Sequence, residues 1–167
     1  MPQLMQRMAQ TSSSRARFSE TKHSTLVKTP LTSSGTLSYN RPDRIAKQTL
    51  SPYEESISVE GDTLTLENKA RGVRHTLALQ SYPVVWAFVE SIRATLSGNL
   101  KMLQRFYALR FDGTPQAWLL SLEPTDVQMA AYVQTIRIRG TEGRITSIEI
   151  FEAGGDRSVM TITPEPQ

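Results

Sequence analysis

The residues of this chain that could do chemistry are few and lie far apart. The two histidines, His23 and His75, have no metal-ligand partner at helical or hairpin spacing. Glu54 and Glu55 are adjacent carboxylates, and neighbouring side chains of a strand point to opposite faces, so they do not form an acid–base pair. The absence of cysteine excludes disulfides, thiolate metal sites and cysteine nucleophiles. We therefore expect no metal, no cofactor and no enzymatic activity.

The serine-rich stretches and the basic residues also lack the setting that catalysis or nucleic-acid binding requires. Residues 12–14 and 33–34 have no glycine frame of a nucleophile elbow, and we interpret them as turns. No glycine-rich loop precedes a predicted helix, as phosphate binding would require. The 19 basic residues exceed the 16 acidic ones only slightly and are scattered along the chain, which argues against nucleic-acid binding. A hydrolase on an all-β scaffold is the weakest alternative.

The spacing of the apolar residues predicts a mainly β fold of about ten strands. Residues 55–60 and 63–67 alternate apolar and polar side chains, and Gly61-Asp62 between them is typical of a two-residue hairpin. Residues 36–40 form another expected strand, preceded by a turn at residues 33–35. The chain has 167 residues and no internal repeat, which predicts a single domain over residues 1–167.

One substantial helix is expected among these strands. Residues 83–97 repeat apolar side chains at helical spacing, with Pro83 suited to the first turn and Gly98 to the end. Shorter helices are expected at residues 3–9, at residues 99–105 and, with Thr125 as a cap, at residues 125–132. No apolar run approaches the roughly 20 residues of a membrane-spanning helix.

The apolar face of the predicted meander must be covered by another element, and the 83–97 helix is the obvious cover. In one interpretation the helices simply complete a packed core. In the other, the sheet curls into an incomplete barrel, and the helices form a lid over an unfilled cavity of several hundred Å³ for an apolar ligand. Trp86 and Trp118 fit either interpretation, as core filler or as cavity wall.

Five landmarks follow one another in the first part of the chain. They are Phe18-Ser19-Glu20-Thr21-Lys22, Ser34-Gly35-Thr36-Leu37-Ser38-Tyr39, Arg41-Pro42-Asp43-Arg44-Ile45, Ser51-Pro52, and Ile57-Ser58-Val59-Glu60-Gly61-Asp62-Thr63-Leu64. Their order resembles the outer-membrane lipoprotein carrier family (LolA-like). The resemblance covers residues 15–66 well and extends beyond them mainly as the order of elements.

The resemblance implies a mainly β fold, an unclosed antiparallel β-barrel or half-barrel with a helical lid over an apolar cavity. It implies a monomeric periplasmic carrier that takes acylated lipoproteins from an inner-membrane transporter and hands them to an outer-membrane acceptor. The chain starts with polar sequence, so a signal peptide has been removed or the protein is cytosolic. The arginine of Arg-Pro helps to hold the lid closed in that family, and here it is Arg41. Ala46-Lys47-Gln48 and Leu64-Thr65-Leu66 replace expected aromatic residues, which indicates a divergent branch and leaves the acylated cargo open.

The side chains expected to line the cavity lie on the inward face of the strands and of the long helix. They are Phe18, Leu37, Tyr39, Ile57, Val59, Leu64, Leu66, Leu77, Leu79, Trp86, Val89, Leu109, Phe111, Trp118, Leu120, Ile136, Ile138, Ile148 and Ile150. The competing hypothesis is an envelope protein-interaction or sensing module on the same fold, with a filled core and no ligand.

Overall fold

Eleven strands form one antiparallel sheet in the computed structural model, which describes residues 13–40, 44–96 and 98–164. The strands are β1 (Ser13–His23), β2 (Leu31–Asn40), β3 (Arg44–Ser51), β4 (Glu55–Glu60), β5 (Thr63–Asn68), β6 (Val73–Ala78), β7 (Tyr107–Thr114), β8 (Ala117–Pro124), β9 (Val133–Thr141), β10 (Arg144–Glu152) and β11 (Arg157–Pro164). The α-helices are α2 (Pro83–Leu96), α3 (Leu100–Phe106) and α4 (Val127–Ala130), and short 3-10 turns lie at Lys69–Arg71 and Leu79–Ser81.

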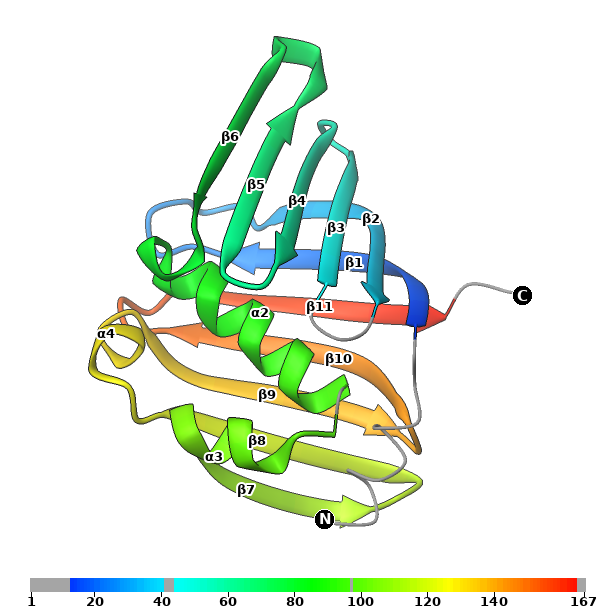
Figure 1. The fold of residues 1–167 in the computed structure, drawn as a ribbon, viewed down its shortest axis with the longest axis vertical. Helices are drawn as coiled ribbons and strands as arrows, with labels where there is room; N and C mark the ends of the chain where they lie inside the picture. The colour runs from blue at the N-terminus through cyan, green and yellow to red at the C-terminus, as the bar shows by residue number, and fades with distance from the viewer. Residues whose placement is uncertain (1–12, 41–43, 97, 165–167) are drawn as a thin grey trace.

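The first and last strands lie side by side in the middle of the sheet. The strand order is β6-β5-β4-β3-β2-β1-β11-β10-β9-β8-β7, so β6 and β7 form the two edges and do not pair with each other. Figure 1 shows that the sheet curves and that α2, α3 and α4 all lie on the same side of it. The predicted unclosed half-barrel with a helical lid is therefore confirmed.

The strand register gathers apolar side chains on the face of the sheet that α2 covers. Two rows of directly opposed residues run from β7 towards the centre: Phe111, Leu120, Ile138, Ile148 and Met160, and Leu109, Leu122, Ile136 and Ile150. Opposed side chains of this kind are the unit of sheet stabilisation. Most members of the two rows are buried, so the inward face of this half of the sheet is a continuous apolar surface.

Two local expectations are wrong for identifiable reasons. Residues 33–35 lie inside β2, where the register with β3 shifts between Ser34 and Gly35. A Cβ on Gly35 would lie 1.9 Å from the carbonyl oxygen of Gln48, so this glycine permits a close approach of two strands rather than a turn. The cap of α4 is Asp126, whose carboxylate accepts the Met129 N–H at 3.0 Å, and not Thr125. The expected helix at residues 3–9 lies outside the described residues.

Helix α2 begins at Pro83 as expected and is followed by Gly98, which has a φ of 69°. The backbone N–H groups of Gly98 and Asn99 donate to the carbonyl groups of Thr95 and Ala94, at 3.1 and 2.9 Å. The helix is buried well beyond its apolar stripe, because Glu90, Arg93 and Thr95 are also buried. Such burial is typical of a helix enclosed by protein on several sides rather than of one resting on a surface.

We predict that Gly140→Ala lowers the free energy of unfolding by about 1–3 kcal/mol, because a Cβ there would overpack the core. It would lie 2.1 Å from the ring of Trp118 and 2.4 Å from the carbonyl oxygen of Arg144. Trp118 cannot easily yield, since its Nε1 donates to the Glu142 carbonyl oxygen at 3.0 Å. Gly154→Ala is the control, since no atom lies within 4 Å of its added Cβ. Equal urea-denaturation free energies for the two variants would contradict this account.

Candidate functional site

Helix α2 is the centre of the candidate site, because it covers the concave face of the sheet. Trp86, Val89 and Ile92 are buried in the main hydrophobic cluster, which also includes residues from β2 to β5 and from β7 to β10. Trp86 also meets the ring of Phe106 in α3 edge-on, with ring centroids 5.7 Å apart. The helix therefore connects the two halves of the half-barrel.

The side chain of Arg93 ties α2 to the β4–β5 hairpin. Its Nη1 donates to the carbonyl oxygen of Gly61 at 2.6 Å, and its Nη2 forms an ion pair with Glu90 one turn earlier. The Arg93 and Glu90 side chains are only 8% and 7% exposed, so neither charge is well solvated. A buried charge is costly unless it is paired and hydrogen-bonded, so these contacts hold helix and hairpin together.

Tyr107 ties the other side of α2 to β7. Its hydroxyl donates to the carbonyl oxygen of Ala87 at 3.0 Å. Burial raises the pKa of Tyr107 far above its usual value, and the negative charges of Glu90 and Asp126 raise it further. The phenol therefore stays protonated and continues to donate this hydrogen bond well above neutral pH.

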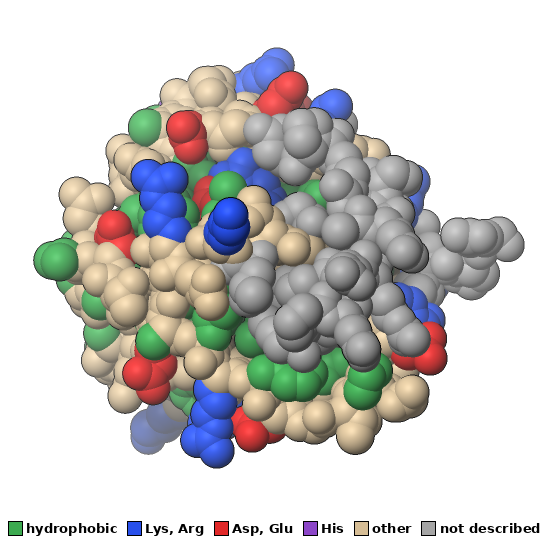
Figure 2. Space-filling model, turned by 60° about the horizontal axis from the view of Figure 1, so that its bottom comes forward, with side chains coloured by type: hydrophobic (Ala, Val, Ile, Leu, Met, Phe, Trp, Pro, Cys, Tyr) green, Lys and Arg blue, Asp and Glu red, His purple; other side chains and the backbone are tan. Residues whose placement is uncertain are grey.

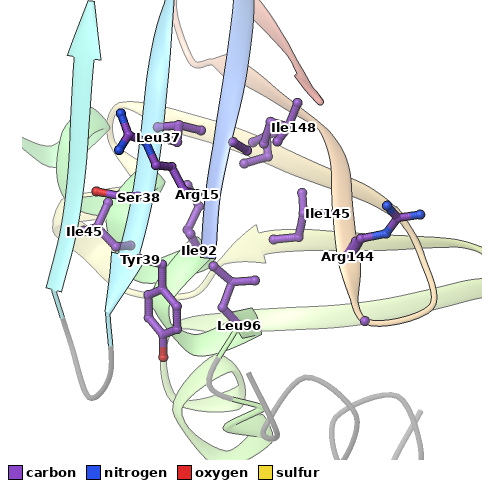
Figure 3. Close-up of a pocket in the computed structure, with 13 residues that line it drawn as sticks. Arg15, Leu37, Ser38, Tyr39, Ile45, Ile92, Leu96, Arg144, Ile145 and Ile148 are labelled. Atoms are coloured by element: carbon purple, nitrogen blue, oxygen red, sulfur yellow. The ribbon is translucent and has the colours of Figure 1, made fainter. Parts of the chain in front are cut away.

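A first cavity of about 150 Å³ lies beside the C-terminal half of α2. Figure 3 shows Ile92 and Leu96 of α2 between Leu37, Tyr39 and Ile45 on one side and Ile145 and Ile148 on the other. Ala16 and Ile162 complete most of its apolar wall. A dry cavity of this size accommodates benzene, which corresponds to roughly six carbon atoms.

Two arginines also border the first cavity, but they do not place a charge inside it. The guanidinium group of Arg144 points away from the cavity in Figure 3. Arg15 is exposed and lies opposite Ser38 in the β1–β2 register. It is adjacent in sequence to Ala16, which faces inward, so the Arg15 side chain is on the opposite face of the strand. The interior of the first cavity is therefore apolar.

A second cavity, also of about 150 Å³, lies beside the N-terminal half of α2. Its apolar wall consists of Val84, Val85, Phe88 and Val89 of the helix, with Ile45, Ile57, Val59 and Ile150 of the sheet. Its other wall is charged and contains the ion pairs Lys47–Glu20 and Lys22–Glu152. Ile45 lines both cavities, so they lie close to each other under the helix. One of the two interpretations of the sequence had a single cavity of several hundred Å³, whereas here the structure has two cavities of about 150 Å³ each.

The structure divides all but one of the predicted cavity residues into three groups. Leu37, Tyr39 and Ile148 line the first cavity, whereas Ile57, Val59, Val89 and Ile150 line the second. The residues in or against the packed core are Phe18, Leu64, Leu66, Leu79, Trp86, Leu109, Phe111, Trp118, Leu120, Ile136 and Ile138. Leu77 is half-buried on the edge strand β6 and borders neither cavity. Their role in ligand binding stays a prediction.

Several cavity residues were not anticipated from the sequence. Ile45, Ile145 and Leu96 are apolar, and Ile45 alternates with Lys47 on the inward face of β3. Lys47 and Glu20 were missed because a charged side chain is normally assigned to the solvent face of a strand. The signal that could have found Lys47 is its two-residue spacing from Ile45.

The remaining sequence-based candidates do not form a chemical site in the described part of the chain. No group of three or more His, Cys, Asp and Glu residues among the described residues could hold a metal ion. None of the described helices is long and apolar enough to cross a bilayer. On the described part of the face in Figure 2, lysine and arginine side chains are interspersed with acidic ones. Arg41 lies outside the described residues, so its role in holding the lid stays a prediction.

We predict that Arg93→Met lowers the free energy of unfolding by about 3–5 kcal/mol, because it leaves the buried Glu90 carboxylate without its cation. The double variant Glu90→Leu/Arg93→Met removes both charges and should recover most of this loss. Arg110→Met is the control, because the Arg110–Asp112 pair is largely exposed and should contribute little. Urea denaturation measures all three. A double variant no more stable than Arg93→Met would refute the role of the buried pair.

We further predict that the stabilising contribution of Tyr107 to the fold is lost at alkaline pH. Its pKa is raised in the folded protein, so its stabilising contribution is complete below the unfolded-state pKa of about 10 and is lost progressively above it. The urea midpoint should therefore decrease more between neutral and strongly alkaline pH in the wild type than in Tyr107→Phe. Tyr132→Phe, at an exposed tyrosine, should keep the wild-type slope. Identical slopes in all three proteins would contradict this.

Comparison with solved structures finds several similar chains, one of them with a TM-score above 0.5. A LolA superfamily protein from Nitrosomonas europaea has a TM-score of 0.52 at 10% sequence identity, covering 98% of this chain and 93% of that chain. A putative outer membrane lipoprotein-sorting protein domain from Vibrio parahaemolyticus has a TM-score of 0.49 at 10% identity, covering 95% and 86%. A chain of the MucA/MucB complex of Pseudomonas aeruginosa has a TM-score of 0.47 at 12% identity, covering 99% and 58%.

The sequence itself places the chain in a family, although it matches no curated protein. The family described as outer membrane lipoprotein carrier protein LolA-like matches residues 1–163, which is nearly the whole chain. This match agrees with the resemblance carried by the landmarks between Phe18 and Leu64. The chain therefore belongs to the outer membrane lipoprotein carrier protein LolA-like family.

Proposed function

We propose that this protein is a periplasmic carrier that binds the acyl chains of lipoproteins, or of a related acylated lipid, beneath α2 and shuttles them towards the outer membrane. An inner-membrane transporter would supply the cargo and an outer-membrane acceptor would receive it. The observation that carries the proposal is the pair of cavities that flank a single buried helix on the concave face of an unclosed sheet. Membership of the LolA-like family supports it.

The cavities are too small for a whole acyl chain while α2 stays in place. Each has a volume of about 150 Å³, enough for roughly six carbon atoms. A myristoyl chain of roughly 14 carbons would exceed either cavity alone. Binding therefore requires α2 to move outward, so that the two cavities join past Ile45 into one groove.

The free energy of burying an acyl chain exceeds that of the hydrogen bonds that hold α2 to the sheet. Each buried CH₂ group contributes about 0.8 kcal/mol, so a chain of roughly 14 carbons contributes about 10 kcal/mol. Opposing this are the Arg93–Gly61 and Tyr107–Ala87 hydrogen bonds and the apolar contacts of α2. A net hydrogen bond contributes only about 1 kcal/mol, or about 2 kcal/mol where a charge is involved. The ligand and the helix therefore compete for the same apolar surface, and cargo release returns that surface to α2.

The proposal predicts saturable binding of a fluorescent fatty-acyl probe to the delipidated protein, weakened by Ala16→Leu. Ala16 lines the first cavity, and the added carbons would occupy space that the acyl chain needs. Displacing two to three carbons removes about 2 kcal/mol, so the Kd of the probe should rise by about 30-fold. Ala46→Leu is the matched control, since Ala46 lies one residue from the inward-facing Ile45 and Lys47 and borders neither cavity.

Two outcomes would overturn the proposal. If the probe does not bind saturably, the chain is not an acyl carrier, and a stable protein partner in pull-downs would identify it as an interaction module. If Ala16→Leu and Ala46→Leu weaken binding equally, the acyl chain does not occupy the first cavity. Thermal unfolding of both variants should show that neither is unfolded, because Ala16→Leu fills empty space.

A further inference from the structure

Four charged side chains line the second cavity, although the neighbouring inward rows of the sheet are apolar. They are Glu20 and Lys22 of β1, Lys47 of β3 and Glu152 of β10. In the β1–β11 register, Glu20 lies opposite Met160, which ends one of the apolar rows described above. The inward face of the sheet thus changes from apolar to charged at the wall of this cavity.

Lys47 reaches Glu20 across an intervening strand. The two residues lie on β3 and β1, and β2 between them carries Gly35 on its inward face, opposite Phe18. Because Gly35 has no side chain, the Lys47 side chain can pass over β2. Its Nζ lies 3.4 Å from Glu20 Oε2 and 5.1 Å from the centre of the Phe18 ring. The same Nζ lies 5.7 Å from the centre of the Phe88 ring in α2, so this charge also contacts the lid.

The second pair is formed by Lys22 and Glu152. Here the lysine is on β1 and the carboxylate on a neighbouring part of the sheet, whereas in the first pair the carboxylate is on β1. Lys22 Nζ lies 3.5 Å from Glu152 Oε2, with the two side chains 43% and 20% exposed. Lys47 and Glu20 are 16% and 21% exposed, so the two pairs differ in the exposure of the lysine and not of the carboxylate. On β1, a carboxylate and an ammonium group therefore stand two residues apart on the same wall, each with its partner on another strand.

These pairs are poorly explained as stabilisers of the fold. Half-buried ion pairs lose hydration, and replacing them with apolar residues is often neutral or stabilising. Their N–O separations of 3.4 and 3.5 Å are also longer than the roughly 2.7–2.9 Å of a close charge-assisted hydrogen bond. Both signs of charge are thus held beside an apolar cavity with capacity for further hydrogen bonding.

We propose that the second cavity binds the zwitterionic head group of a phospholipid, whose acyl part lies under α2. The phosphate would face Lys47 and Lys22, and the ammonium group would face Glu20 and Glu152. A head group with a single charge would lie close to two side chains of the same sign, either the two lysines or the two glutamates, which disfavours binding. Ile45 borders both cavities, so the acyl tail passes this residue on its way into the apolar first cavity. This inference rests on the proposed function and names the lipid class that the carrier prefers.

The test is displacement of the fluorescent acyl probe by amphiphiles that share a twelve-carbon chain and carry different head groups, each below its micelle-forming concentration. They are lauroyl-lysophosphatidylcholine (zwitterionic), lauroyl-lysophosphatidylglycerol (anionic), dodecyltrimethylammonium (cationic) and monolaurin (neutral). The zwitterionic lipid should displace the probe at a concentration about tenfold lower than either singly charged lipid. Equal displacement by all four lipids would reject the head-group site while leaving the acyl carrier intact.

Single variants should shift the preference in opposite directions. Lys47→Met leaves the carboxylates in excess, so the cationic lipid should gain and the anionic lipid should lose affinity, each by about tenfold. Glu20→Gln should do the reverse. Monolaurin should bind both variants as it binds the wild type, because it has no charge.

Arg139→Met and Glu149→Gln are the matched controls, since they remove the same charges from an ion pair that borders neither cavity. If the controls shift the preferences as the cavity variants do, the effect is one of net charge and the proposal fails. If Lys47→Met does not fold, Lys47→Met/Glu20→Met removes one of the two pairs and leaves Lys22 and Glu152, so it should reduce the preference for the zwitterionic lipid without favouring either singly charged lipid. Failure of every lipid and of the probe to bind would instead reject the proposed function itself.

Discussion

The structure depends on the burial of one helix in the concave face of an open sheet. An antiparallel sheet with one apolar face must cover that face, and an unclosed sheet cannot do so by curling onto itself. In this protein α2 supplies most of the cover, and it is buried well beyond its apolar stripe. Because the helix sits in the concavity rather than on a flat surface, even Glu90 and Arg93 become buried and must satisfy each other and the Gly61 carbonyl group.

A straight helix fills a curved surface imperfectly, which accounts for the two cavities beside the two halves of α2. Each cavity has a volume of about 150 Å³, and the apolar side chains that line it lack packing partners on that side. The fold tolerates this because the helix is also held by polar contacts, Arg93 to one half of the sheet and Tyr107 to the other. Each of these contacts joins the helix to one half of the sheet, so together they hold it in position.

The sequence predicts most of the fold and little of the site, for a physical reason. Strand alternation, the Gly61-Asp62 hairpin and the helix beginning at Pro83 depend on neighbouring residues, so each is visible in a short stretch of sequence. Gly35 shows the limit of this reasoning. The composition of residues 33–35 indicated a turn, whereas in the structure Gly35 allows β2 to approach β3 closely. Lys47 and Glu20 are 27 positions apart and meet only after three strands have paired, so no local pattern could reveal their contact.

The charged wall of the second cavity also bears on how a carrier can release what it binds. Binding that relied on apolar surface alone would strengthen with every buried carbon and offer no means of discrimination between lipids of equal chain length. Polar groups beside the cavity add selectivity through the cost of mismatched charges, and they do so without adding apolar area. Because Lys47 contacts both Glu20 and the Phe88 ring of α2, a head group that engages Lys47 also alters a contact of the lid. Cargo recognition and the position of the helix are then coupled through one side chain, which gives the carrier a physical link between the lipid it selects and the state of its lid.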